Sequence, residues 1–218
     1  MKTTICIFAK PPMPGQAKTR LIPALGSQRA AEVARALLDD VIRASMLVNR
    51  AQVVISTTEM FQTEEAVPVW LQPQGDLGIR LEKTLQLALQ SSDSAIALGA
   101  DTPGLTALML SQAADRLGRE DAVLGPTDDG GYYMIGMRRC PNGLFQNIRW
   151  STQETFRDTL HQFAQFNLGY SIVPKWFDLD TPDDLQRVRC LIRAGVDMGT
   201  KLARVLGALD MATAKEIA

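Results

Sequence analysis

The sequence predicts an α/β domain with a mixed, mainly parallel sheet of about seven strands and helices on both faces. Up to about residue 125, short runs of β-type apolar residues alternate with longer segments of helical periodicity. The short runs are apolar at nearly every position, as expected of strands that are buried on both faces. The pattern is looser after residue 125, so the sheet is not expected to be wholly parallel.

Seven segments have the composition of strands. They are residues 5–9, 52–57, 67–72, 94–100, 122–125, 132–137 and 170–174. The alternation of the first five with helical segments implies right-handed crossovers and parallel pairing. We expect the segment 132–137 to run antiparallel to its neighbours.

Apolar residues that recur three and four positions apart predict helices between the strands. Ser27 is expected to cap the first helix, because a serine oxygen can accept a hydrogen bond from the first turn. Asp76 is expected to cap a second helix, which carries leucines four residues apart. A third helix is expected around residues 105–117.

The second half of the chain contains two further helix starts. Ser151 and Glu154 have the spacing of a capping box for a helix that contains the only histidine. Thr181, with proline next and Asp184 in the first turn, predicts another helix start. From about residue 196 the chain can form an amphipathic helix and a tail, and we predict a single domain over residues 1–218.

Composition excludes several classes of protein. The chain has 218 residues, 23 cationic and 24 anionic side chains and a formal net charge of −1. A protein that coats nucleic acid usually carries a basic excess, so nucleic acid is not the expected partner. No run approaches the ~18 apolar residues of a membrane span. The N-terminus lacks the features of a signal peptide, so we expect a cytoplasmic protein; the oligomeric state is left open.

Cysteine and histidine chemistry is not indicated. Cys6, Cys140 and Cys190 are far apart, and no CxxC pair suggests a zinc site or a disulfide framework. His161 would have to serve any Ser-His-Asp or Cys-His mechanism. It lies within a segment of helical periodicity, so we interpret it as structural.

The loop after the first strand is the strongest local signal. It reads FAKPPMPGQAKTRL and places Lys10, Lys18 and Arg20 around Gly15 and three prolines. Glycine allows a ligand to approach the backbone, and proline limits the freedom of the loop before binding. The loop is not a Walker A motif. It predicts a binding site for phosphates, against the alternative of a rigid surface turn with solvated cations.

Acidic residues follow three other strands. Asp101 follows residues 94–100, Asp128 and Asp129 follow residues 122–125, and Asp178 and Asp180 follow residues 170–174. Ligands of an open α/β sheet bind outside the carboxyl ends of its strands, so these acids are expected near the basic loop. Carboxylates suit Mg²⁺, although each aspartate taken alone could simply form a turn or start a helix.

Five ordered motifs carry a family resemblance. They are FAKPPMPGQAKTRL, GADTPGL, GPTDDGGYYMIG, RWSTQETF and FDLDTPDDL. Together they resemble a bacterial family of the GT-A (nucleotide-diphospho-sugar transferase) superfamily, labelled glycosyltransferases of the arsenosugar-biosynthesis type. The resemblance spans roughly residues 3 to 195 and implies the GT-A fold. More distantly, the chain resembles phospholactate and molybdenum-cofactor guanylyltransferases.

The resemblance implies a nucleotide site on two segments. The phosphates would bind to residues of the basic loop, namely Lys10, Gly15, Lys18 and Arg20. The nucleobase would lie near Gln74, Gly75 and Gly78 in the segment QPQGDLG.

The resemblance also implies catalytic and metal roles. Asp101 would be the metal aspartate of the superfamily, present as a single Asp and not as a D-x-D motif. Asp180 would be the second ligand of a Mg²⁺ or Mn²⁺ ion. Asp129 would face the acceptor, and Lys18 and Asp129 would be the catalytic residues.

Three functions stay open at this point. A glycosyltransferase would transfer a sugar from a nucleotide-sugar to a small-molecule acceptor, which the family label favours. A nucleotidyltransferase would couple a nucleoside triphosphate to an acceptor phosphate or carboxylate, which three cations in the loop favour. A non-catalytic nucleotide-binding module would not need two aspartates suited to a metal.

Overall fold

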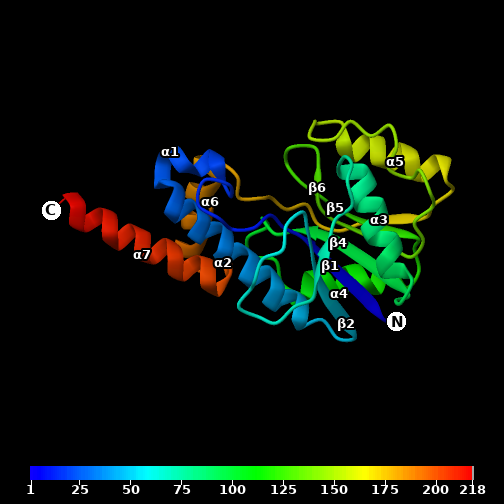
Figure 1. Ribbon diagram of the computed structural model, residues 1–218, viewed down its shortest axis with the longest axis horizontal. Coiled ribbons are helices and arrows are strands. Elements are labelled where there is room, and N and C mark those ends of the chain that lie inside the picture. Colours follow the sequence, from blue (N-terminus) through cyan, green and yellow to red (C-terminus); the bar gives the residue numbers. More distant parts are fainter. Residues whose placement is uncertain (218) are drawn as a thin grey trace.

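The protein is built on a seven-stranded sheet with the order β3-β2-β1-β4-β6-β5-β7 (Figure 1). The computed structural model describes residues 1–217, and the side chains of residues 1–211. The strands are β1 (Thr3–Phe8), β2 (Ala51–Thr57), β3 (Val69–Leu71), β4 (Ser94–Gly99), β5 (Ala122–Pro126), β6 (Tyr132–Met137) and β7 (Tyr170–Ile172). Strand β6 is antiparallel to β4 and β5, and the other neighbours are parallel, so the predicted mixed sheet is confirmed.

The helices form two layers on the sheet and a group at one end of it. They are η1 (Thr19–Leu21), α1 (Ile22–Leu25), α2 (Ser27–Met46), α3 (Leu77–Leu89), α4 (Ala107–Arg116), α5 (Thr155–Gln165), α6 (Pro182–Arg193) and α7 (Thr200–Ile217). Figure 1 shows α1, α6 and α7 gathered with the start of α2 at the left of the molecule. Over the described residues, none of the helices is both long enough and apolar enough to cross a membrane.

The strands are buried on both faces because successive side chains point to opposite sides of a strand. In β1, Ile5 and Ile7 pack into a cluster with Leu38 of α2 and Leu110 of α4. Cys6, between them, packs on the opposite side with Leu85 of α3 and Phe163 of α5. The sheet is covered by α2 and α4 on one face and by α3 and α5 on the other. This double coverage explains why the strands are apolar at nearly every position.

Two predicted helix starts are confirmed. The carboxylate of Asp76 accepts a hydrogen bond from the Ile79 N–H at 2.9 Å. The hydroxyl of Thr181 accepts from the Asp184 N–H, and the Asp184 carboxylate accepts from the Thr181 N–H at 2.8 Å. Both caps are local, which explains why residue type and spacing predict them.

The other two predicted caps are wrong. Gly26, with φ 79°, joins α1 to α2, so Ser27 is already the first helical residue and caps nothing. Ser151 has φ 59°, and α5 begins only at Thr155. Threonine hydroxyls hold this turn instead, because Thr152 accepts from the Glu154 N–H and Thr155 donates to the Arg149 carbonyl.

Helix α7 starts against a carboxylate from another helix. Asp40 of α2 accepts hydrogen bonds from the backbone N–H groups of Lys201 at 3.0 Å and Leu202 at 2.9 Å. N–H groups in the first turn of a helix have no partner within their own helix, so Asp40 acts as the N-terminal cap of α7. The predicted helix from about residue 196 is confirmed as α7, whereas the end of the predicted tail, residue 218, lies outside the described residues.

We predict that Asp40→Ala lowers the free energy of unfolding by about 1 kcal/mol, because two N–H groups lose their acceptor. Burial raises the pKa of Asp40, which disfavours the ionised carboxylate. We therefore expect the loss of unfolding free energy to stay below the largest losses that removal of a helix cap causes. Urea unfolding measures the change. The control Asp115→Ala, exposed on α4, should stay within about 0.5 kcal/mol, and an equal loss there would contradict the assignment.

Candidate functional site

A cavity of about 500 Å³ opens at the carboxyl ends of β1, β2 and β4. It is lined by the loop after β1, the start of α3, the residues that follow β4, and the segment before α6. Among the described residues that line it, the charged ones are Lys10, Lys18, Arg20, Arg80, Asp101 and Asp180. Its size is that of a small-molecule site, and it lies where open α/β sheets bind their ligands.

Lys18 joins the two aspartates of this cavity. Its Nζ lies 2.7 Å from an oxygen of Asp101 and 2.9 Å from an oxygen of Asp180. The Lys18 side chain is 4% exposed, whereas the side chains of Asp101 and Asp180 are 50% and 47% exposed. The ammonium therefore lies beneath two carboxylates that are still accessible from solvent.

The charge on Lys18 follows from these partners. Burial alone would lower the pKa of Lys18, because it disfavours an ammonium group. The nearby charges and hydrogen bonds of Asp101 and Asp180 outweigh burial and raise the pKa above its ordinary value. Lys18 is thus a cation held by two anions.

The loop after β1 aims Lys18 inward through two positive φ angles. Gly15 has φ 81°, and the carbonyl of Met13 accepts hydrogen bonds from the N–H groups of Gln16 and Ala17. Lys18 itself has φ 48° and ψ 44°, and the fully buried Leu21 anchors the chain just after it. A lysine in this left-handed region costs about 1 kcal/mol or more, and such residues gather at functional sites.

A segment that we call the strap, residues 173–181, brings Asp180 to the cavity. It leaves β7 and crosses the carboxyl edge of the sheet, where the Trp176 N–H donates to the Pro126 carbonyl. Further on, the Leu179 N–H donates to the Asp101 carbonyl at 2.9 Å, and the Trp176 indole donates to the Pro103 carbonyl at 2.7 Å. These bonds explain how Asp101 and Asp180 meet despite their distance in the sequence.

A third carboxylate lies beneath this pair. Asp178, also on the strap, accepts a hydrogen bond from the Thr102 hydroxyl at 2.8 Å. Burial is the main cause that raises the pKa of Asp178 to about 6, and the negative charges of Asp101 and Asp180 act in the same direction. The site therefore concentrates more negative charge than Lys18 alone neutralises.

Five of the site residues predicted from the sequence line the cavity, and the others lie outside it. Lys10, Lys18, Arg20, Asp101 and Asp180 all line the cavity. The remaining ones, Gly15, Gln74, Gly75, Gly78 and Asp129, are not among its lining residues.

Two of the residues outside the cavity have clear structural contacts. A side chain on Gly78 would meet the Phe145 carbonyl at 2.8 Å, so this glycine allows α3 to pack closely. The Asp129 carboxylate accepts hydrogen bonds from the Thr127 hydroxyl and the Gly131 N–H, which shapes the turn between β5 and β6.

Sequence reasoning missed Arg80 and the pairing of Lys18. Arg80 lines the cavity from the first turn of α3, and its guanidinium donates to the Asp76 carbonyl at 3.2 Å and to the Gln72 side chain at 3.3 Å. Arg80 lies one turn after the Asp76 cap, in the helix that follows the carboxyl end of β3. This position is the sequence signal from which Arg80 could have been predicted as a site residue. The inward direction of Lys18 has no comparable signal, since lysine rarely adopts positive φ.

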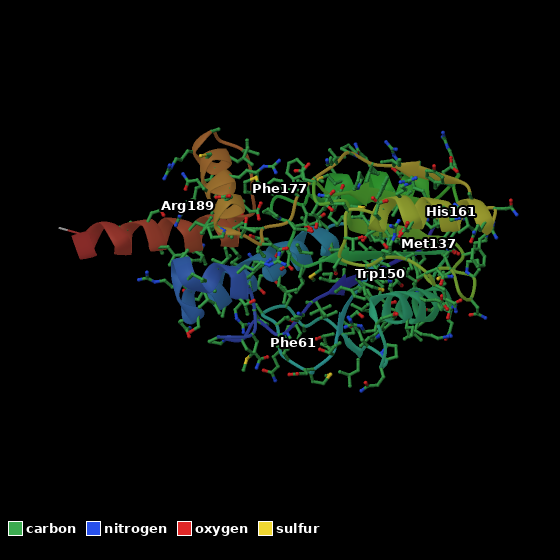
Figure 2. The ribbon with its side chains drawn as sticks, turned by 90° about the horizontal axis from the view of Figure 1, so that it is seen from above. Phe61, Met137, Trp150, His161, Phe177 and Arg189 are labelled. Carbon is green, nitrogen blue, oxygen red and sulfur yellow. The ribbon has the colours of Figure 1, made fainter. Side chains whose placement is uncertain are left out.

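His161 lies away from this site. It is exposed on α5, and its Nε2 is 3.0 Å from the side-chain nitrogen of Gln165. Figure 2 shows His161 towards the right of the molecule and Arg189 of α6 towards the left, with Phe177 of the strap between them. This position agrees with a structural interpretation of His161.

Comparisons with solved structures identify the class of fold. A proposed nucleotide-diphospho-sugar transferase from Desulfovibrio desulfuricans G20 is 27% identical, with a TM-score of 0.86 over 97% of this chain and 96% of that one. A cytidylyltransferase from Leptospira borgpetersenii is 15% identical, with a TM-score of 0.58 over 98% and 96% of the two chains. CMP:2-keto-3-deoxy-manno-octonic acid synthetase, complexed with CTP, is 11% identical, with a TM-score of 0.57 over 89% and 100%.

The fold is therefore that of the nucleotide-diphospho-sugar transferase superfamily, as the sequence resemblance implies. Residues 32–152 match the model of a family described as an uncharacterized protein conserved in bacteria, DUF2064. The match covers more than half of the chain, and the chain belongs to this family. The search of curated proteins found no match.

We predict that the charge balance at Lys18 decides the stability of this site. Asp101→Asn and Asp180→Asn should each cost about 1 kcal/mol, because the other carboxylate still neutralises Lys18. The double variant should lose about 3 kcal/mol or more, because it removes both of the carboxylates that contact a buried ammonium. Adding Lys18→Met to the double variant should restore much of the loss.

Urea unfolding of these four variants and the unmodified protein measures the changes. The exposed pair of Lys175 and Asp128, with oxygen and nitrogen 2.8 Å apart, supplies the control, and Asp128→Asn should cost less than about 1 kcal/mol. Strictly additive single and double variants would show that Lys18 does not depend on both carboxylates.

Proposed function

We propose that the protein is a metal-dependent transferase that transfers a sugar from a nucleotide-sugar to a small-molecule acceptor. One observation carries this proposal. Carboxylates from the end of β4 and from the strap converge on a single cation at the edge of a cavity that other cations also line. Anionic phosphates and a divalent ion need this combination of charges in one place. We propose further that residues 1–218 act as one nucleotide-binding domain.

The donor phosphates would bind to the exposed cations of the cavity. Lys10 and Arg20 form no ion pair with any described side chain, so their charges are available to a ligand. Arg80, on the other side of the cavity, uses part of its guanidinium for Asp76 and Gln72. Arginine can hold two phosphate oxygens at once, which favours Arg20 as the main phosphate ligand.

Asp101 and Asp180 have the chemistry to hold a divalent ion. Mg²⁺ keeps several waters and is usually bound by one or two carboxylates together with substrate phosphates. The two carboxylates converge on one point and are half exposed to the cavity, which fits this mode of binding. When bound, a divalent ion supplies charge stabilisation to the diphosphate that leaves the sugar.

The remaining residues of the proposed site have supporting roles. Asp178 would keep Thr102 and the strap in place beneath the two metal ligands. Asp129 would act on the acceptor side by shaping the turn between β5 and β6, through Thr127 and Gly131. Gln72 and Leu77 line the cavity, whereas Gln74, Gly75 and Gly78 do not, so Gln72 and Leu77 would contact a bound base in their place.

Glycosyl transfer is supported by the relative from Desulfovibrio desulfuricans G20, which is 27% identical over nearly the whole of both chains. Nucleotidyl transfer to an acceptor phosphate or carboxylate is the second candidate. It is favoured by the exposed cations Lys10 and Arg20 together with the half-buried Arg80, which would suit a triphosphate. Among solved structures of the same fold, one is a cytidylyltransferase, and CMP:2-keto-3-deoxy-manno-octonic acid synthetase was solved with CTP.

We predict that Lys10→Ala and Arg20→Ala each weaken binding of the donor nucleotide by about 1.5–3 kcal/mol, the range for a charge-assisted hydrogen bond. Calorimetric titration with nucleotide-sugars and nucleoside triphosphates at fixed Mg²⁺ measures the change. The control Arg157→Ala removes an arginine that is 83% exposed on α5 and should leave affinity unchanged. Unchanged affinity in both test variants would reject the loop as the phosphate site.

The two chemistries leave different products. We expect glycosyl transfer to release a nucleoside diphosphate from the nucleotide-sugar, because the bond between sugar and phosphate breaks. Nucleotidyl transfer would instead release pyrophosphate from a triphosphate. Mass spectrometry of reactions with each donor and a mixture of small acceptors distinguishes them, and Asp101→Asn should abolish either product. Pyrophosphate with a nucleotidylated acceptor, and no nucleoside diphosphate from any nucleotide-sugar, would replace the first candidate with the second.

A further inference from the structure

The place between Asp101 and Asp180 is already held by a cation. The Nζ of Lys18 lies 2.7 Å and 2.9 Å from one oxygen of each carboxylate. A divalent ion bound by these same two oxygens would occupy the same convergence point. An ammonium and a divalent ion repel each other at such a short distance, so the two cannot share it.

We propose that Lys18 and the divalent ion exchange: the ion displaces the ammonium from Asp101 and Asp180, and the freed ammonium turns to the donor phosphates. This inference rests on the proposed function for its metal and its nucleotide. It adds that the two ligands bind with positive coupling, since the ion prepares a phosphate contact and the phosphates stabilise the displaced lysine. The same side chain is thus a counter-ion in the free protein and a phosphate ligand in the complex.

Exposure of the three side chains allows the exchange. Asp101 and Asp180 are half exposed, whereas Lys18 is almost wholly covered, so an ion entering from the cavity reaches the carboxylates before it meets the ammonium. Lys18 also lines the cavity. The lysine side chain is a flexible chain of four carbons that ends in an ammonium group with three N–H donors. The ammonium can therefore move while the backbone stays fixed.

The backbone around Lys18 is well anchored. Leu21 is fully buried in the cluster formed by α2, α6 and α7, and the Leu21 N–H donates to the Lys18 carbonyl at 2.8 Å. Only the side chain needs to change rotamer. The exchange therefore requires no rearrangement of the fold.

The ligand set indicates weak metal binding before the exchange. Among the described residues, no group of three or more His, Cys, Asp and Glu side chains could hold a metal ion. Two carboxylates shared with an ammonium leave the divalent ion to find its other ligands in water and phosphate oxygens. Removal of the competing ammonium should therefore strengthen metal binding even when no nucleotide is present.

The test measures Mn²⁺ binding without nucleotide, using the electron paramagnetic resonance signal of the free ion. Lys18→Met should bind Mn²⁺ at least about tenfold more tightly than the unmodified protein, within the usual range of coupling between two sites. Asp101→Asn in the Lys18→Met background should remove this gain. Equal or weaker binding in Lys18→Met, or a gain that survives Asp101→Asn, would overturn the exchange.

The control variant is Lys201→Met. Lys201 pairs with Glu64 at 2.6 Å, so this change removes one positive charge and one ion pair away from the cavity. It should leave Mn²⁺ affinity unchanged. A gain equal to that of Lys18→Met would assign the effect to net charge and overturn the proposal.

A second measurement uses the unmodified protein, in case Lys18→Met does not fold. Amine acetylation mapped by mass spectrometry should label Lys18 slowly without metal and several-fold faster with Mn²⁺, while labelling of Lys201 stays constant. Labelling of Lys18 that does not respond to Mn²⁺ would overturn the exchange. Both experiments omit nucleotide, so their outcome is separate from the nucleotide titrations that test the proposed function.

Discussion

The three-way contact of Lys18 with Asp101 and Asp180 is the constraint around which the functional end of the molecule is arranged. It joins the loop after β1, the end of β4 and the strap before α6, which are distant in the sequence. Each of these segments is also fixed by apolar burial close by, at Leu21, Ala100 and Leu179. The contact is therefore made between anchored backbones, and only side chains are left to respond to a ligand.

The sheet order explains why the strap is needed. Antiparallel β6 lies between β4 and β5, so β7 is three positions from β4, the strand that Asp101 follows. A helix that started directly after β7 would leave Asp180 far from the cavity. The strap instead crosses the strand ends, and its hydrogen bonds to the Pro126, Pro103 and Asp101 carbonyls hold it there. The insertion of β6 thus requires an extended crossing segment, and that segment supplies Asp178 and Asp180 to the site.

The sequence predicts those features that depend on local patterns. Strands buried on both faces give unbroken apolar runs, and the caps at Asp76 and Thr181 involve residues within one turn. The capping prediction at Ser151 is wrong because the neighbouring Thr152 and Thr155 supply the hydroxyls of that turn. A bond from the Phe156 N–H to the distant Gly130 carbonyl also fixes the start of α5. Convergence of Asp101 and Asp180 follows from the rule that ligands bind at strand ends. The inward direction of Lys18 depends on a left-handed backbone that its residue type disfavours, so sequence alone cannot supply it.

Stability alone does not account for this arrangement. A buried ion pair is a weak source of stability, because apolar residues of similar volume often serve as well or better. The left-handed backbone at Lys18 adds a further cost, and Lys10 and Arg20 contribute exposed cations without ion pairs to described side chains. The backbone conformation and the charges of this loop go against the usual preferences of their residue types, whereas the strands follow theirs. Such local conflicts are typical of functional sites. Charges that are poor for packing would serve the ligand of the proposed function, which brings both phosphates and a divalent ion, and this would explain why they lie together at the edge of the sheet.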